Sequence, residues 1–175
     1  MRNIDHNSVS LAGEFAVLSQ LALRNFDANM TLGHTKGVDI LVSDPKTKKM
    51  YRLEVKTKYS TTPKESHLSK VFGTVLGEWM MDKKHEGMVD PSLFYCFVIY
   101  SEPKSAFQFF IVPSRVVARY VKEEHKHWLR VKGKEGKKVK DTEMRIFRIG
   151  FKGEKYRVAT PTVQDYKDKW KFRVP

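Results

Sequence analysis

The sequence predicts an α/β sandwich, in which helices flank a mixed central β-sheet of four or five strands. The main observation is the order of the periodic segments, which runs helix, strand, strand, helix, strand, strand, helix. The second is a continuous apolar run over residues 93–100, as expected of a central strand buried on both faces. The third is charge: residues 115–175 hold 19 Lys and Arg against 8 Asp and Glu, whereas residues 1–114 hold 14 against 12. This asymmetry favours a globular unit with a basic C-terminal extension that faces a polyanion, although a merely lysine-rich surface is the simpler alternative.

The first expected element is a helix over about residues 11–26. Its apolar stripe, which should face inward, recurs at helical spacing and consists of Leu11, Phe15, Leu18, Leu21, Ala22 and Phe26. Glu14 lies within its apolar arc, where a carboxylate is costly unless something satisfies it. Residues 37–44 then alternate as a strand, and residues 50–58 alternate as its partner. The turn chemistry of Asp44–Thr47 predicts that these two strands form a hairpin.

The remaining elements follow from the same patterns. In chain order we expect a helix over 62–79, strands over 93–100 and 107–112, a helix over 114–128, a mobile lysine- and glycine-rich loop over 130–140, and short strands over 145–149 and 155–159. Thr62, Pro63 and Glu65 give the second helix the signature of a capping box. We therefore divide the chain into a core of residues 1–128 and a basic C-terminal extension of residues 129–175.

Composition excludes several classes of protein. Cys96 is the single cysteine, so the chain has neither a disulfide framework nor a cysteine-based zinc site, and we expect Cys96 to be a small core residue. The longest apolar run has eight residues, far fewer than a bilayer requires, and the N-terminus lacks the apolar stretch of a secretory signal. We therefore expect a soluble, intracellular, cytoplasmic protein whose partner is neither a membrane nor a small-molecule substrate.

Asp39, Glu54 and Lys56 form the most informative constellation. Asp39 lies on one strand of the expected hairpin, and Glu54 and Lys56 lie on the other, where residues two apart project from one face about 7 Å apart. If the strands pair, the two carboxylates form a hard-oxygen site suited to Mg²⁺ or Mn²⁺. A metal there can bind a phosphate oxygen and lower the pKa of a bound water. The lysine can orient that water or stabilise charge on the phosphate.

This arrangement resembles the active site of the PD-(D/E)XK nuclease superfamily. The match consists of Gly37-Val38-Asp39-Ile40 and Glu54-Val55-Lys56, with 14 residues between the aspartate and the glutamate. Val38 stands where the name of the motif has proline, a position that varies within the superfamily. Glu14 occupies the place of the helix acid that several branches share. The layout is most similar to that of archaeal Holliday junction resolvases, and the resemblance covers about residues 8–121.

The resemblance implies a restriction-endonuclease-like fold and a metal-dependent endonuclease that hydrolyses phosphodiester bonds of DNA. The substrate would be branched DNA, as for a Holliday junction resolvase, or a duplex site, as for a restriction enzyme. Asp39 and Glu54 would bind Mg²⁺ or Mn²⁺ together with the backbone carbonyl of Val55. Lys56 would position the attacking water, and Glu14 would support the site or a second metal ion. A junction enzyme would also be a symmetric homodimer, because paired cuts need two sites.

Each of these residues has a plainer explanation. Glu14 could simply favour the positive end of the first helix, and Glu54 and Lys56 could belong to a solvated ladder of alternating charges. Asp39 could be a surface carboxylate near the turn, but aspartate is disfavoured in strands, so a functional role is preferred. At the level of the whole protein, the alternative is a non-catalytic nucleic-acid-binding protein that keeps the fold. A structural subunit of a larger complex is a third hypothesis.

Nucleic-acid contacts are also expected outside this constellation. Lys36 and Lys58 lie near it and could contact phosphates or be solvated surface. The lysine-rich loop is expected to contact the phosphate backbone without reading sequence, and its lysines are Lys132, Lys134, Lys137, Lys138 and Lys140. The alternative is a solvated loop. Trp170 could either stack on a base or pack the C-terminal tail against the fold.

Overall fold

The computed structural model describes residues 4–31, 37–60, 76–136, 140–150 and 158–172, apart from the side chains of Pro103 and Lys134. The chain forms two compact units: the first contains residues 1–63, 90–113 and 166–175, and the second contains residues 64–89 and 114–165. Neither unit is a continuous segment, so this division differs from the one expected at residue 128. That position lies inside the helix α3 (Ser114–Lys134).

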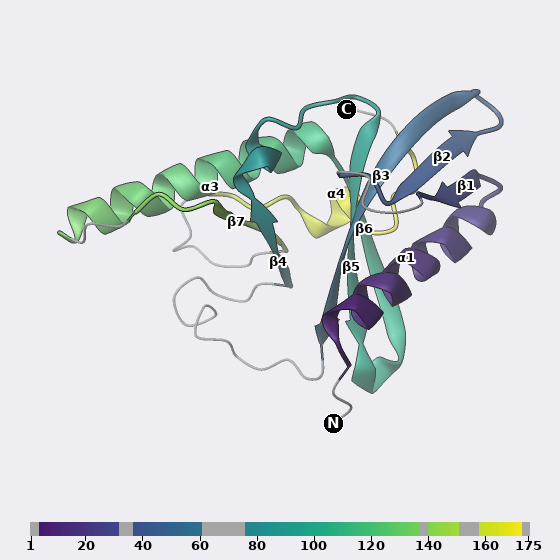
Figure 1. Ribbon diagram of the computed structural model, residues 1–175, viewed down its shortest axis with the longest axis horizontal. Coiled ribbons are helices and arrows are strands. Elements are labelled where there is room, and N and C mark those ends of the chain that lie inside the picture. The colour runs from purple at the N-terminus through teal and green to yellow at the C-terminus, as the bar shows by residue number, and fades with distance from the viewer. Residues whose placement is uncertain (1–3, 32–36, 61–75, 137–139, 151–157, 173–175) are drawn as a thin grey trace. The chain divides into compact units, whose positions relative to one another are not determined.

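The first unit is built on a five-stranded mixed sheet (Figure 1). In spatial order its strands are β1 (Asp27–Met30), β2 (Ile40–Asp44), β3 (Lys49–Ser60), β5 (Leu93–Ser101) and β6 (Ala106–Pro113). The short 3-10 helix η2 (Glu102–Lys104) joins the last two. β3 and β5 run parallel, whereas the other neighbouring pairs are antiparallel. The expected mixed α/β fold is confirmed, and so is the hairpin of β2 and β3.

Helix α1 (His6–Ala22) lies along one face of this sheet (Figure 1). It begins earlier than expected because Asp5 caps it: the Asp5 carboxylate accepts a hydrogen bond of 3.0 Å from the backbone N–H of Ser8. It also ends earlier, since Asn25 has a φ of 60° and turns the chain into β1. That strand was not predicted, because four residues are too few to show an alternation.

The buried side of α1 differs from the expected apolar stripe. Its buried residues are Gly13, Val17 and Leu21, which are spaced four residues apart. Leu11 and Phe15, which the stripe placed inward, are 45% and 55% exposed. The helix is apolar around much of its circumference, so periodicity could not identify the face that packs. Tertiary contacts determine which face of α1 packs: Gly13 has no side chain and allows the helix to approach the sheet closely.

The core of the first unit lies between α1 and the sheet. It consists of Val17, Leu21, Ile40, Val42, Leu53, Val55, Phe94, Cys96, Val98, Phe109, Ile111, Trp170 and Phe172. Cys96 is fully buried there, as expected. Because alternate residues of a strand face opposite ways, the inward positions of Leu53 and Val55 put Glu54 and Lys56 on the other face of the sheet.

The second unit pairs β4 (Gly77–Asp82) with β7 (Met144–Ile149) in an antiparallel sheet, which packs with helix α3 (Figure 1). The short helices η1 (Lys83–Glu86) and α4 (Val163–Tyr166) complete the described elements. β7 confirms the strand expected over 145–149. None of the helices in the described part of the chain is long and apolar enough to span a membrane.

Two expected elements of this unit are corrected. The helix expected over 62–79 is wrong at its end, because the strand β4 begins at Gly77. Trp79 and Met81 are buried there, two residues apart, as alternate residues of a strand are. The mobile loop expected over 130–140 is wrong at its start, because α3 continues through Lys134. Lysine is a good helix former, and the helix ends only where Gly136 takes a φ of 70°. The first part of the helix expected over 62–79 and most of the strand expected over 155–159 lie outside the described residues.

Candidate active site

Asp39 is held by the backbone of the neighbouring strand. Its N–H donates to the Leu53 carbonyl oxygen at 2.8 Å, and its Oδ2 accepts a hydrogen bond from the Val55 N–H at 2.7 Å. Leu53 and Val55 flank Glu54 in β3, so the backbone segment that carries the Glu54 carboxylate also positions Asp39. The expected convergence of the two strands at this point of the hairpin is therefore present.

Glu54 is buried, with 3% of its surface exposed, and it is held from two sides. Its Oε1 forms an ion pair with Nζ of Lys56 at 2.7 Å. Tyr95 stands directly opposite Glu54 in the parallel register of β3 and β5 and forms a hydrogen bond with its carboxylate. Burial raises the pKa of Tyr95, and the charge of Glu54 and this bond raise it further, so the hydroxyl keeps its proton and donates. A carboxylate buried this deeply needs such partners.

Glu14 approaches the same group from α1. It is half-buried, and burial raises its pKa. The negative charge of Asp39 raises it further, whereas a hydrogen bond from Ser10 and the positive charge of Lys56 lower it. The helix carboxylate is thus close enough to interact electrostatically with residues of the hairpin. Asp39, Glu54 and Lys56 are joined by the contacts described above, whereas Glu14 is linked to Asp39 and Lys56 only by these electrostatic effects on its pKa.

The cluster carries an excess of negative charge. Burial raises the pKa of Asp39, the Val55 hydrogen bond opposes this, the charge of Glu54 raises it again, and the charge of Lys56 lowers it. The Lys56 ammonium group pairs with Glu54, and its positive charge also acts on Asp39 and Glu14, so one cation offsets three carboxylates only in part. Such a group attracts a cation, and ionisable residues with shifted pKa values are typical of functional sites.

The oxygen donors near Asp39 suit a hard divalent cation such as Mg²⁺. Among the described residues, no group of three or more His, Cys, Asp or Glu side chains is arranged to hold a metal ion, so Glu14 does not complete such a group. Asp39 and Glu54 supply two carboxylates, and Val55, whose N–H bonds to Asp39, directly follows Glu54 in β3. Mg²⁺ commonly takes one or two carboxylates and keeps several waters. The chemistry of the set fits this ion with two protein carboxylates.

The predicted phosphate-binding lysines are spread over the chain. Lys58 lies in β3 on the same face as the cluster, since it is four residues from Glu54. Lys132 lies on α3 and pairs with Glu135 at 2.9 Å, which corrects its placement in a loop, and Lys140 is exposed. Both belong to the second unit, as does Lys134, the last residue of α3. Lys36, Lys137 and Lys138 lie outside the described residues.

Sequence reasoning missed Tyr95 and left Trp170 open. Tyr95 belongs to the apolar run of β5, where a tyrosine looks like any other core residue, and only the pairing of β3 with β5 brings it to Glu54. Trp170 is 5% exposed and packs against Phe109, with a centroid distance of 5.3 Å, while the Arg24 guanidinium lies 5.0 Å from its ring. Of its two alternatives, packing of the C-terminal tail is confirmed.

No protein-family model matches the sequence, and no curated protein is significantly similar to it. Among solved structures, the chain is similar to a bacterial homing endonuclease, I-Ssp6803I, with a TM-score of 0.51 and 11% sequence identity. The alignment covers 95% of this chain and 91% of that one. The chain has a nuclease-like α/β fold. At this identity the likeness concerns the fold alone, so the nuclease-like fold and the Asp39–Glu54–Lys56 cluster are separate observations.

Proposed function

We propose that the chain is a metal-dependent endonuclease of the PD-(D/E)XK type, which hydrolyses phosphodiester bonds in DNA. The observation that carries the proposal is the 2.7 Å hydrogen bond from Val55 N–H to Asp39 Oδ2. It ties the carboxylate of Asp39, which directly precedes β2 rather than lying within the strand expected over 37–44, to the residue that follows Glu54 in β3. Lys56 pairs with Glu54 beside it. The nuclease-like fold and the net charge of +13 support a polyanionic substrate.

In this proposal Asp39, Glu54 and the Val55 carbonyl oxygen hold Mg²⁺ or Mn²⁺. The bound ion supplies a Lewis acid for the phosphate and lowers the pKa of a water molecule. Lys56 lies beside Glu54, where its ammonium group can orient the attacking water and stabilise negative charge that builds on the phosphate oxygens. Glu14 supports the set from α1. Attack of water breaks the P–O3′ bond and leaves a 5′-phosphate and a 3′-hydroxyl.

The substrate class is a second part of the proposal. The resemblance of the motif layout to Holliday junction resolvases favours cleavage selected by DNA structure, as at a four-way junction, over a long duplex site. Paired cuts in a junction require two sites, so a junction enzyme would act as a symmetric homodimer. A monomer by light scattering at the working concentration would contradict the junction version and leave the nuclease itself standing.

The decisive experiment measures cleavage of labelled linear duplex, single strand, flap and four-way junction with Mg²⁺, Mn²⁺ or EDTA. The wild type is compared with Glu54→Gln and with Glu143→Gln, which changes a carboxylate that is 80% exposed in the second unit. We expect metal-dependent cleavage that Glu54→Gln reduces to background and Glu143→Gln leaves unchanged. The preferred substrate then names the class.

The alternative function is a non-catalytic nucleic-acid-binding protein, which the basic charge alone would support. Tight, salt-sensitive binding without cleavage of any substrate would favour it over the nuclease. Cleavage that persists in Glu54→Gln would contradict the assigned site. The same assay therefore separates the two functions and tests the residues.

A further inference from the structure

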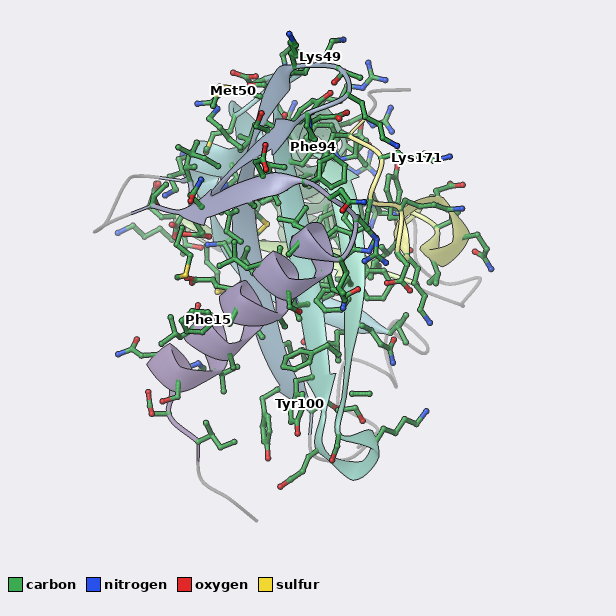
Figure 2. All side chains as sticks on the ribbon, turned by 90° about the vertical axis from the view of Figure 1, so that its right-hand side faces the viewer. Phe15, Lys49, Met50, Phe94, Tyr100 and Lys171 are labelled. Atoms are coloured by element: carbon green, nitrogen blue, oxygen red, sulfur yellow. The ribbon has the colours of Figure 1, made fainter. Side chains whose placement is uncertain are left out.

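A second feature of the first unit lies beside the turn of the β2–β3 hairpin. It is a cavity of about 970 Å³, here called the hairpin-turn pocket, and its lining includes Phe26, Lys46, Lys49, Met50, Tyr51 and Lys171. Figure 2 shows Lys49, Met50 and Lys171 toward one end of the sheet, whereas Tyr100 lies toward the other. A cavity of this volume is within the range that binds small organic groups.

The charged groups that line the pocket favour an anion. Lys46, Lys49 and Lys171 are exposed and carry three positive charges. Asp44 is the one acid among the described lining residues, and its carboxylate already holds the turn, through hydrogen bonds of 2.9 Å from the Lys46 N–H and from Oγ1 of Thr47. The excess of ammonium groups therefore complements a phosphate.

The floor of the pocket is aromatic and apolar. Tyr51 and Phe26 are half-buried, so part of each ring remains accessible, and Met50 is 65% exposed. The Tyr51 ring is held by its neighbours, because it stacks on Phe172, which also lines the pocket, at a centroid distance of 5.0 Å and meets Phe94 at 5.9 Å. Fixed aromatic rings are the surfaces on which unpaired bases stack, and methionine adapts to the shape of what it contacts.

The pocket has a defined separation from the candidate active site. Asp44 pairs with Lys49 at the turn, and Ile40, four residues earlier in the same ladder, pairs with Leu53. At about 3.4 Å per residue this corresponds to roughly 14 Å. Tyr51 of the pocket and Glu54 of the cluster lie on opposite faces of β3, so the two features are separate places on the first unit.

We propose that the hairpin-turn pocket binds one unpaired nucleotide of the DNA substrate, with its base against Tyr51 and Met50 and its phosphates beside Lys49 and Lys171. The choice of DNA as the anion rests on the proposed nuclease function. An unpaired nucleotide fits better than a duplex, because a duplex offers the lysines its phosphates but has no free base to cover the aromatic floor. The pocket would thus favour substrates that carry unpaired nucleotides.

The test is binding measured by fluorescence anisotropy in EDTA, so that its outcome does not depend on cleavage. The probes are a labelled single strand, a flap and a fully paired duplex. Tyr51→Leu removes the aromatic ring from the floor of the pocket. The double variant Lys49→Glu/Lys171→Glu removes two positive charges at exposed positions, where the fold does not depend on them. Lys104→Glu, on the exposed lysine of η2, is the matched control. Thermal melting verifies that each variant is folded.

We expect Tyr51→Leu to weaken binding of the single strand and the flap about tenfold and to leave the duplex unchanged. The double variant should reduce the slope of log K against log salt for the single strand by about 1.4, because two phosphate contacts are lost. Lys104→Glu should do neither. If Tyr51→Leu weakens binding of the single strand, the flap and the duplex equally, the proposal is wrong and the pocket contacts only the DNA backbone. If neither Tyr51→Leu nor the double variant changes binding, the pocket does not bind DNA and the proposal is also wrong. Competition by an acidic peptide as strong as by DNA would reassign the pocket to a protein partner.

Discussion

The two units of the chain treat buried charge in opposite ways. In the second unit, Arg148 is 2% exposed and its guanidinium contacts Glu78 at 3.2 Å and Glu124 at 2.8 Å. The second buried arginine, Arg145, forms an ion pair with Glu86. Here cations and carboxylates are matched, which is how a fold tolerates buried charge.

In the first unit the charges are not matched. Burial raises the pKa of Glu14 and of Asp39, and Lys56 is the cation that their cluster shares with Glu54. By contrast, a hydrogen bond from His125 lowers the pKa of Asp141 in the second unit. The comparison indicates that the network of the second unit serves stability, whereas the first unit keeps incompletely compensated negative charge at a cost in stability.

The largest expected effect comes from breaking the matched network. Arg148→Met leaves Glu78 and Glu124 without their shared guanidinium, so we expect a loss of about 3–5 kcal/mol in the free energy of unfolding, measured by urea denaturation. The control is Lys84→Met, which removes an exposed ion pair of 3.9 Å with Asp82 and should cost no more than about 0.5 kcal/mol. Equal effects of the two variants would remove the distinction between buried and exposed pairs.

Next in size is Tyr95→Phe, which keeps the buried ring and removes the hydroxyl that donates to Glu54. We expect a loss of about 1.5–3 kcal/mol in the free energy of unfolding, because a charged acceptor loses a donor. If the nuclease proposal holds, the Mg²⁺ concentration for half-maximal cleavage should also rise about tenfold, since the hydroxyl orients a metal ligand. Tyr51→Phe is the control, because Tyr51 lies on the opposite face of β3. An unchanged metal requirement would limit Tyr95 to a structural role.

Gly13→Ala probes the close approach of α1 to the sheet, one residue before Glu14. A Cβ at this position would collide with Oγ1 of Thr57 in β3, so we expect a loss of about 1–3 kcal/mol although alanine favours helices. Gly133→Ala in α3 meets nothing within 4 Å and should instead stabilise by up to about 1 kcal/mol. Thr57→Ala should partly rescue the first variant, with a coupling of at least about 0.5 kcal/mol in a double-mutant cycle. Stabilisation by Gly13→Ala would mean that the helix can move away freely.

The smallest expected effect is a change in melting temperature, whose sign should differ between a substitution of Asp39 in the first unit and one of Asp141 in the second. A carboxyl whose pKa is raised by folding contributes stability that is present at low pH and is lost as the pH rises through the folded-state pKa. Asp39→Asn should therefore raise the melting temperature at pH 7, and the gain should shrink as the pH falls toward 4. Asp141, whose pKa is lowered, should behave oppositely, so Asp141→Asn should lower the melting temperature at pH 7. Melting curves across this range supply the measurement, and equal signs for both variants would contradict the comparison.

Local patterns were sufficient for much of the fold. The β2–β3 hairpin, the apolar strand β5 and the strands β6 and β7 follow from alternation, apolar runs and turn residues, which are short-range properties. Patterns failed where one segment satisfied two periods, as in β4, or was apolar on several sides, as in α1. In both cases the deciding contacts come from residues far away in the chain.

The sequence by itself determined the charge asymmetry, the mixed α/β architecture and the order of Glu14, Asp39, Glu54 and Lys56 along it. Only the tertiary structure decided how these residues are held: the Val55 N–H on Asp39 and the Tyr95 hydroxyl on Glu54 depend on strand register. Register is a long-range property, because the pairing of β3 with β5 joins segments about forty residues apart, which no local pattern encodes. The cluster's chemistry is therefore visible in the sequence, whereas its geometry depends on how distant strands pair.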